Sequence, residues 1–201
     1  MKRIGLLAFV AMILTGPATA SNWVRVAERA VTEFGDHGSS VQHNGTIEYA
    51  FSPREGAEKL VLKVIGSARS EIRMMTYSLT SAPVVEALIA ARRRGVEVSI
   101  VSDYKNNLVD DRTGKARAAL SALVNAGCRV RTISVYPIHH DKVIVADRET
   151  VETGSFNYSD AAANKNSENV MVVWKNPDLA RGYLAHWQDR FNKGEDYRTN
   201  Y

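Results

Sequence analysis

The strongest constraint on the fold is an alternation of short apolar runs with helical patterns that begins near residue 47. The apolar runs predict strands at residues 47–51, 71–79, 96–101, 128–133, 142–146, 151–155 and 169–174. Apolar residues at helical spacing predict helices at residues 55–68, 81–94 and 115–126, and a final helix with Pro177 at its first position. Strands interleaved with helices predict one α/β domain per chain, with a mixed, largely parallel sheet flanked by helices on both faces.

The first twenty residues have the pattern of a secretory signal peptide. Lys2 and Arg3 give a charged start, residues 4–14 are apolar, and a run of small residues ends at Ala20. A membrane anchor is the alternative, but the apolar stretch is too short to cross a bilayer. We expect cleavage after Ala20, export to a periplasm or out of the cell, and no membrane span in the mature chain.

Removal of these twenty residues from the 201 would leave 181, which suits one domain with a sizeable core. We expect an N-terminal helix and loop at residues 21–44 and the main domain at residues 45–201. The mature chain would carry 24 basic and 22 acidic residues, an excess too small to indicate nucleic-acid binding by itself. Cys128 is the one cysteine in the sequence, and we expect it to be buried and unpaired.

A group of polar residues lies around the predicted strands at 142–146 and 151–155. Residues two apart on a strand point to the same side, so His140 and Lys142 would present an imidazole and an ammonium together. Ser155 and Asn157 would do the same at the end of the next strand. Glu168, just before the strand at 169–174, is the candidate carboxylate behind the histidine.

These residue types suit the transfer of an anionic phosphoryl group. A neutral imidazole at His140 can attack phosphorus and form a covalent intermediate. Lys142 and Asn157 would neutralise the charge that builds on the non-bridging oxygens, and Ser155 could add a hydrogen bond. Glu168 would hold the tautomer of the histidine and stabilise its positive form.

The full pattern resembles the signature of the phospholipase D superfamily. It reads His140-x-Lys142-x4-Asp147, followed by Gly154-Ser155-x-Asn157. The likeness covers about residues 45–201. Within the superfamily, the sequence is similar to the small, single-motif bacterial endonucleases. It implies a mixed sheet between helices and hydrolysis of phosphodiesters through a phosphohistidine, with no metal or other cofactor. It also implies supporting roles for Asp147 and Gly154.

The superfamily chemistry uses two such motifs, and a second histidine protonates the leaving oxygen. Among the five histidines of this chain, only His140 has a lysine two residues later. The resemblance therefore implies a two-fold homodimer with its active site across the interface. The two copies of His140 would take opposite roles, one neutral for attack and one charged for proton donation.

A metal site is the main alternative for the histidine-rich stretch. His139, His140 and Asp141 are consecutive ligand types, but neighbours on a strand point apart. The sequence also has no second ligand cluster to complete such a site. We therefore expect no bound metal, with His139 facing away from the site.

A polar loop at residues 103–114 supplies candidate contacts to substrate. Tyr104, Lys105, Arg112 and Lys115 lie in or just after it, and ligands of open α/β sheets gather at such strand ends. Tyr104 could stack on a base, and the three cations could meet phosphates. Two aspartates in the same loop weaken this interpretation.

Three functions fit these residues. The first is an endonuclease without sequence preference that acts on DNA, with RNA as a further substrate, since no sequence-reading module is present. The second is a phospholipase with the same catalytic residues, which would favour an exposed apolar entrance. The third is a binding protein on an inactive scaffold, which the presence of all five expected site residues disfavours.

Overall fold

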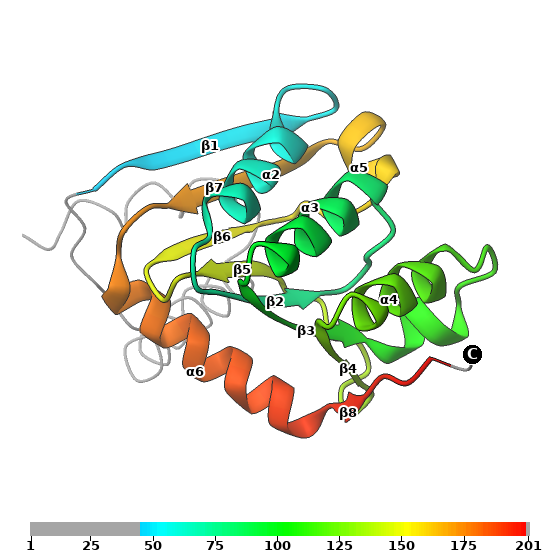
Figure 1. Cartoon of the computed structure of the whole chain (residues 1–201). Coiled ribbons are helices and arrows are strands. Elements are labelled where there is room, and N and C mark those ends of the chain that lie inside the picture. The colour runs from blue at the N-terminus through cyan, green and yellow to red at the C-terminus, as the bar shows by residue number, and fades with distance from the viewer. Residues whose placement is uncertain (1–44, 200–201) are drawn as a thin grey trace, which may run out of the picture. The chain divides into compact units, whose positions relative to one another are not determined.

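Eight strands form one sheet in the computed structural model, which describes residues 45–199 (Figure 1). The strands are β1 (Ile47–Ser52), β2 (Glu71–Thr76), β3 (Glu97–Asp103), β4 (Arg129–Ile133), β5 (Lys142–Ala146), β6 (Thr150–Gly154), β7 (Glu168–Val173) and β8 (Glu195–Asp196). The helices are α2 (Ala57–Ser67), α3 (Ala82–Arg93), α4 (Lys115–Asn125), α5 (Asp160–Asn164) and α6 (Pro177–Lys193), with a π-helical turn η1 (Lys105–Val109). The predicted signal peptide at 1–20 and the predicted helix and loop at 21–44 lie outside the described residues.

The sheet is mixed, with the strand order β1-β7-β6-β5-β2-β3-β4-β8. β2 pairs with β3, and β3 with β4, in parallel, whereas the other pairs in this sheet are antiparallel. The expected mixed sheet is confirmed, but the expectation that it is largely parallel is wrong. The turn between β5 and β6 spans only residues 147–149, and so short a connection permits only antiparallel neighbours.

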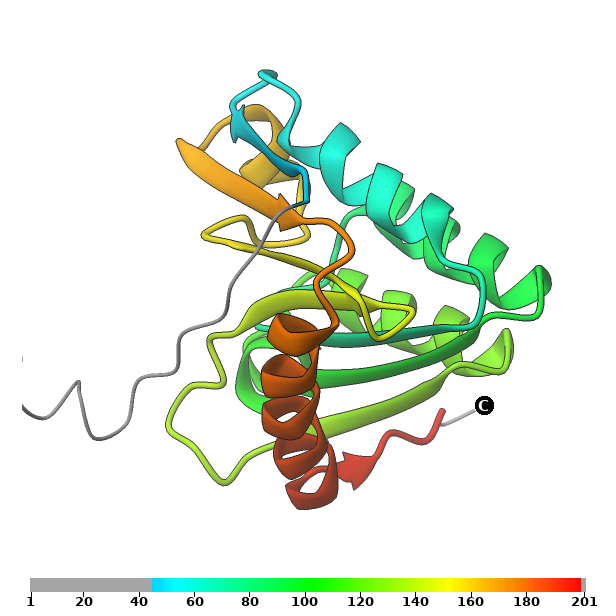
Figure 2. The same ribbon diagram turned by 90° about the vertical axis from the view of Figure 1, so that its left-hand side faces the viewer.

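Helices cover both faces of the sheet, as expected (Figure 2). α2, α3 and α4 lie on one face, and the apolar side chains of α2 and α3 pack there on alternate residues of the central strands. α6 crosses the opposite face, where Trp187 and Phe191 stack on each other with 4.6 Å between ring centroids. Within residues 45–199, no helix is long and apolar enough to cross a lipid bilayer.

One part of the sheet carries exposed apolar side chains. On β1, Ala50 packs against the core beneath α2, so the alternating residues Ile47, Tyr49 and Phe51 point to the opposite face. These three are 46–72% exposed, and Met171 of the paired strand β7 is 42% exposed. We call these four residues the β1–β7 apolar face.

Three elements were not expected from the sequence. Residues 105–109 form the turn η1 where a loop was predicted, and Asn107 anchors it by donating to the carbonyl oxygens of Tyr77 and Asp103. The short helix α5 begins at the Ser159 cap, and β8 pairs with the end of β4. The predicted strand at 71–79 ends earlier, at Thr76.

Cys128 lies just before β4 and is buried in the larger core, as expected. Burial raises the pKa of its thiol to about 11, although the nearby Arg92 guanidinium acts in the opposite direction.

Candidate active site

The predicted catalytic residues gather at one end of the sheet. β2 ends at Thr76, which pairs with Lys142 at the start of β5. β6 ends at Gly154, directly before Ser155, and β7 begins at Glu168. The antiparallel order of β5, β6 and β7 is what brings the start of one strand beside the end of the next.

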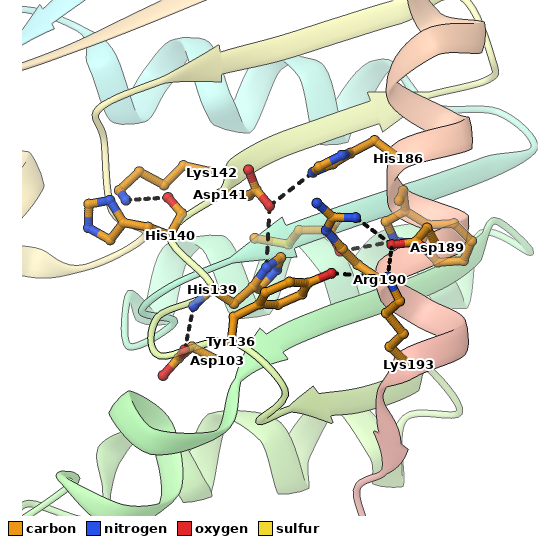
Figure 3. A network of polar contacts seen from close by, with 12 residues as sticks. Asp103, Tyr136, His139, His140, Asp141, Lys142, His186, Asp189, Arg190 and Lys193 are labelled. Atoms are coloured by element: carbon orange, nitrogen blue, oxygen red, sulfur yellow. Dashed lines mark hydrogen bonds and ion pairs between the residues drawn. The ribbon is translucent and has the colours of Figure 1, made fainter. Parts of the chain in front are cut away.

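His140 and Lys142 lie together, as the sequence predicts (Figure 3). His140 is exposed and precedes β5, whereas Lys142 is buried and begins that strand. The Nζ atom of Lys142 donates to the carbonyl oxygen of His140 at 2.8 Å. This hydrogen bond holds the ammonium of Lys142 beside the backbone of His140.

Tyr77 completes this corner of the site and was not named as a site residue from the sequence. Its ring meets the His140 imidazole edge to face, with 4.7 Å between centroids. The Lys142 ammonium lies 5.4 Å from the centroid of the same ring. One aromatic side chain thus contacts both polar groups, which limits the positions that they can take.

Burial shifts the ionisation of Lys142. Loss of water lowers the pKa of its ammonium, while Glu168 and Asp141 favour the charged form and oppose this shift. A partly dehydrated ammonium interacts more strongly with an anion than a surface lysine does. Lys142 is thus suited to hold a phosphoryl oxygen.

Ser155 and Glu168 form a short hydrogen-bonded pair. The Ser155 hydroxyl donates to Glu168 Oε2 at 2.6 Å and accepts from the backbone N–H of Asn169 at 3.1 Å. The second carboxylate oxygen of Glu168 accepts from the Asn166 side chain at 3.1 Å. The structure thus joins Glu168 to Ser155, and contact of this carboxylate with His140 stays a prediction.

Asn157 has a buried side-chain oxygen that lacks a hydrogen-bond partner among the described residues. Buried polar atoms rarely remain unpaired in native proteins. The amide oxygen and nitrogen exchange places when the group turns over, so the side chain can also present an N–H to an anion. This unpaired amide fits the predicted role of binding phosphoryl oxygen.

Gly154 is required by a close backbone contact. A Cβ atom at this position would lie 2.1 Å from the carbonyl oxygen of Asn169 and 2.9 Å from its carbon. The same carbonyl accepts from the backbone N–H of Ser155 at 3.1 Å. Absence of a side chain at Gly154 therefore lets β6 and β7 approach where Ser155 and Glu168 meet.

The comparisons with known proteins agree with this geometry. Residues 61–193 match the family model described as "Cardiolipin synthase, PLD-like domain". A protein from Rickettsia bellii named phospholipase D is 36% identical over 144 residues, which cover 72% of this chain and 68% of the relative. The chain belongs to the phospholipase D superfamily.

Solved structures of relatives place the fold in the same superfamily. The phospholipase D family member Nuc from Salmonella typhimurium is 49% identical, with a TM-score of 0.73 over 77% of this chain and 99% of that one. NucT from Helicobacter pylori shares the fold at 20% identity, with a TM-score of 0.65 over 76% of this chain and all of the other. The expected fold and superfamily are confirmed, and with them an enzyme of the phosphodiesterase type.

Asp147 of the superfamily signature lies at the far end of β5 from His140 and has a structural environment. Its carboxylate accepts the backbone N–H groups of Arg69, Ser70 and Glu71 at 2.7–3.1 Å, and also the Ser70 hydroxyl. Burial by itself would raise the pKa of this carboxyl group, but the hydrogen bonds from Ser70, Glu71 and Arg69 outweigh it and lower the pKa. The contacts are those of a supporting residue.

We expect Asp147→Asn to lower the free energy of unfolding by about 1–2 kcal/mol near neutral pH, because a charged acceptor is lost. Asparagine tolerates the left-handed backbone (φ 52°), so the turn itself is preserved. Because the folded pKa is lowered, the carboxylate stabilises the fold above its unfolded pKa of about 4, and this contribution is lost as pH falls through the folded value. Urea unfolding of both proteins near neutral and near pH 3 measures the effect. A difference independent of pH would contradict it.

His139 lies apart from His140, as expected (Figure 3). It is buried, its backbone N–H donates to Asp103 at 2.8 Å, and its Nδ1 atom lies 3.3 Å from the Asp141 carboxylate. Within residues 45–199, no group of three or more His, Cys, Asp or Glu side chains is arranged to hold a metal ion.

The candidate substrate residues of the loop at 103–114 lie in different places. Tyr104 lines a groove of about 500 Å³ with Arg117 and Arg198. Lys115 lines another, of about 580 Å³, whose walls include Glu58 and Asp160. Lys105 and Arg112 are exposed. Contact of Tyr104, Lys105, Arg112 and Lys115 with a substrate stays a prediction.

Proposed function

We propose that this chain is an endonuclease without sequence preference, which hydrolyses DNA, and RNA as a further substrate, through a covalent phosphohistidine and without a metal. The observation that carries the proposal is the pairing of an exposed imidazole at His140 with a buried ammonium at Lys142, at the sheet end that also holds Ser155, Asn157 and Glu168. This group offers a nucleophile beside an anion-binding cation.

In the proposed reaction, a ring nitrogen of a neutral His140 attacks phosphorus. A bond forms between nitrogen and phosphorus as the bond to the leaving oxygen breaks, and a second, protonated histidine gives that oxygen its proton. Lys142 and the Asn157 amide bind the non-bridging oxygens as charge builds on them. Water then attacks phosphorus, loses a proton to the second histidine, and releases His140.

The second histidine is proposed to come from a second copy of the chain. The sequence has one His-x-Lys pair, so the chemistry needs another copy of His140. The β1–β7 apolar face supports such an assembly, because Phe51 pairs in register with Asn169, whose amide contacts Ser155. Exposed apolar surface thus continues up to the site, where a two-fold partner would have to lie.

Exposed apolar side chains in the loop before His140 favour a second candidate, a phospholipase. Val135 and Ile138 are 58% and 56% exposed, and the end of η1 adds Val109 at 59%. Such residues could enter a lipid surface beside the catalytic group. We rank the endonuclease first because two exposed cations lie on segments that contact site residues. Lys105 begins the turn η1, whose Asn107 donates to the Tyr77 carbonyl oxygen. Lys165 directly precedes Asn166, which donates to Glu168, and such cations can meet the phosphates of a nucleic acid.

The deciding test uses the protein from Ser21 onward with plasmid DNA in excess EDTA, and with cardiolipin-containing vesicles in parallel. We expect plasmid cleavage in EDTA, faster than vesicle hydrolysis, with specific activity falling on dilution as the dimer dissociates. Activity that needs a divalent ion would rule out the metal-independent mechanism. Faster hydrolysis of vesicles would make the protein a phospholipase, and constant activity per chain on dilution would rule out the shared site.

A further inference from the structure

A second polar network lies behind the candidate active site, on the side of α6 (Figure 3). Asp141 stands between His140 and Lys142 in the sequence but points away from them, toward the helix. One oxygen of its carboxylate, Oδ2, lies 3.2 Å from Nε2 of His186 on α6 and 3.3 Å from Nδ1 of His139. Two imidazoles therefore converge on the residue that separates the nucleophile from its neighbouring cation.

The segment that these contacts hold is the loop at 134–141 between β4 and β5. His140, one of the exposed residues of this loop, packs against the Tyr77 ring, so the orientation of its imidazole depends on the conformation of the loop. At the end of the loop, the His139 backbone donates to the buried Asp103 carboxylate. The contact between Asp141 and His186 also connects this loop to the helix α6.

The same helix holds the loop at a second point. Lys193 of α6 donates to the hydroxyl of Tyr136 at 3.2 Å and to the carboxylate of Asp189 at 2.9 Å. Arg190, which also donates to Asp189, lies 5.0 Å from the centroid of the Tyr136 ring. α6 thus contacts the loop near its start, at Tyr136, and at its end, at Asp141.

We propose that His186, acting through Asp141, is a positioning residue that holds the loop at 134–141 and so aims His140 at the substrate. The inference rests on the proposed role of His140 as the nucleophile. His186 lies on α6 and contacts Asp141 on the side away from His140 and Lys142, so its role would be indirect (Figure 3). Displacement of a reacting group by about 1 Å can lower the rate by about 100-fold. A contact that positions the nucleophile can therefore change the reaction rate without touching the substrate.

The chemistry of the three side chains is consistent with this arrangement. A neutral imidazole donates one N–H, and the Asp141 carboxylate accepts from several donors at once. Burial lowers the pKa of His139, although the nearby Asp141 and Asp103 carboxylates act in the opposite direction. The lowered pKa favours a neutral ring that donates through Nδ1 to Asp141. The Nε2 atom of that ring has no partner among the described residues, as expected for the unprotonated nitrogen.

The test compares His186→Leu with His186→Gln, using bis-p-nitrophenyl phosphate as a small phosphodiester. Leucine removes the donor, and we expect kcat to fall about 10-fold with KM changed less than about 2-fold. Glutamine keeps an N–H donor and should restore kcat to within about 3-fold of the wild type. Gln188→Leu places the same apolar side chain at an exposed site on α6 and serves as the matched control.

Hydrogen exchange of the backbone amides measures how firmly the loop is held and does not depend on catalytic turnover. We expect exchange at 138–141 to be at least about 10-fold faster in His186→Leu than in the wild type, and near wild type in His186→Gln. Wild-type kcat and exchange in the leucine variant would overturn the inference, as would equal losses in both variants. If the wild type cleaves no phosphodiester, the proposed function fails, and the exchange data alone decide whether His186 anchors the loop.

Discussion

His140→Ala is expected to reduce phosphodiester hydrolysis by about 10⁴-fold or more, since loss of a nucleophile removes the covalent route entirely. The loss should appear in kcat, with substrate binding largely kept, because Lys142 and Asn157 remain to hold the phosphoryl oxygens. The side chain is exposed, so the melting temperature should change by less than about 2 °C. Initial rates on plasmid DNA and on bis-p-nitrophenyl phosphate, with a thermal melt of each protein, measure both effects.

Ser134→Ala is the matched control, because Ser134 is exposed in the same loop. It should retain activity within about 2-fold of the wild type. Residual activity of His140→Ala above about 1% of the wild type would exclude a covalent role for this histidine and point to activated water as the nucleophile.

Gly154→Ala is expected to lower the free energy of unfolding by about 3 kcal/mol, because the added methyl group would overlap the backbone of Asn169. Backbone atoms cannot rotate away as a flexible side chain can, so β6 and β7 must separate where Ser155 meets Glu168. For a domain of this size, the melting temperature should fall by about 6–12 °C. We also expect lower kcat in the surviving folded protein, since Ser155 and Asn157 follow directly.

Gly182→Ala provides the control for this substitution. A Cβ atom at Gly182, on the exposed side of α6, meets nothing within 4 Å. Alanine favours a helix over glycine, so the variant should be more stable by about 0.5–1 kcal/mol. Calorimetry of both variants checks the pair. A melting temperature for Gly154→Ala within about 2 °C of the wild type would show that β7 can shift freely.

The catalytic signature could be predicted because its chemistry depends on local spacing. His140 and Lys142 are two residues apart, and Ser155 and Asn157 follow the next strand, so a single hairpin brings them together. The direction of the sheet could not be predicted in the same way. Apolar runs indicate strands but not their partners, and the turn at 147–149 decides the antiparallel pairing through two left-handed residues, Asp147 and Arg148.

Contacts between segments that lie far apart in the sequence could not be predicted. Tyr77 directly follows β2, far from His140 in the chain, and nothing in its spacing shows that the two rings meet. Glu168 is predicted to lie behind His140 because it precedes the expected strand at 169–174, but this position alone cannot say which of several nearby polar groups it will bind. His186 is not predicted as a site residue, because the helical pattern around it shows which side of the helix it occupies but not which side chains it contacts.

The buried position of Cys128 bears on how two copies of the chain could associate. Thiols react with oxidants and with other thiols as thiolates, and at a pKa of about 11 roughly one in ten thousand is ionised at neutral pH. The sequence has no other cysteine, and this one is enclosed by the core. A disulfide between copies through Cys128 is therefore disfavoured, and the proposed dimer would be held by non-covalent contacts and would depend on protein concentration.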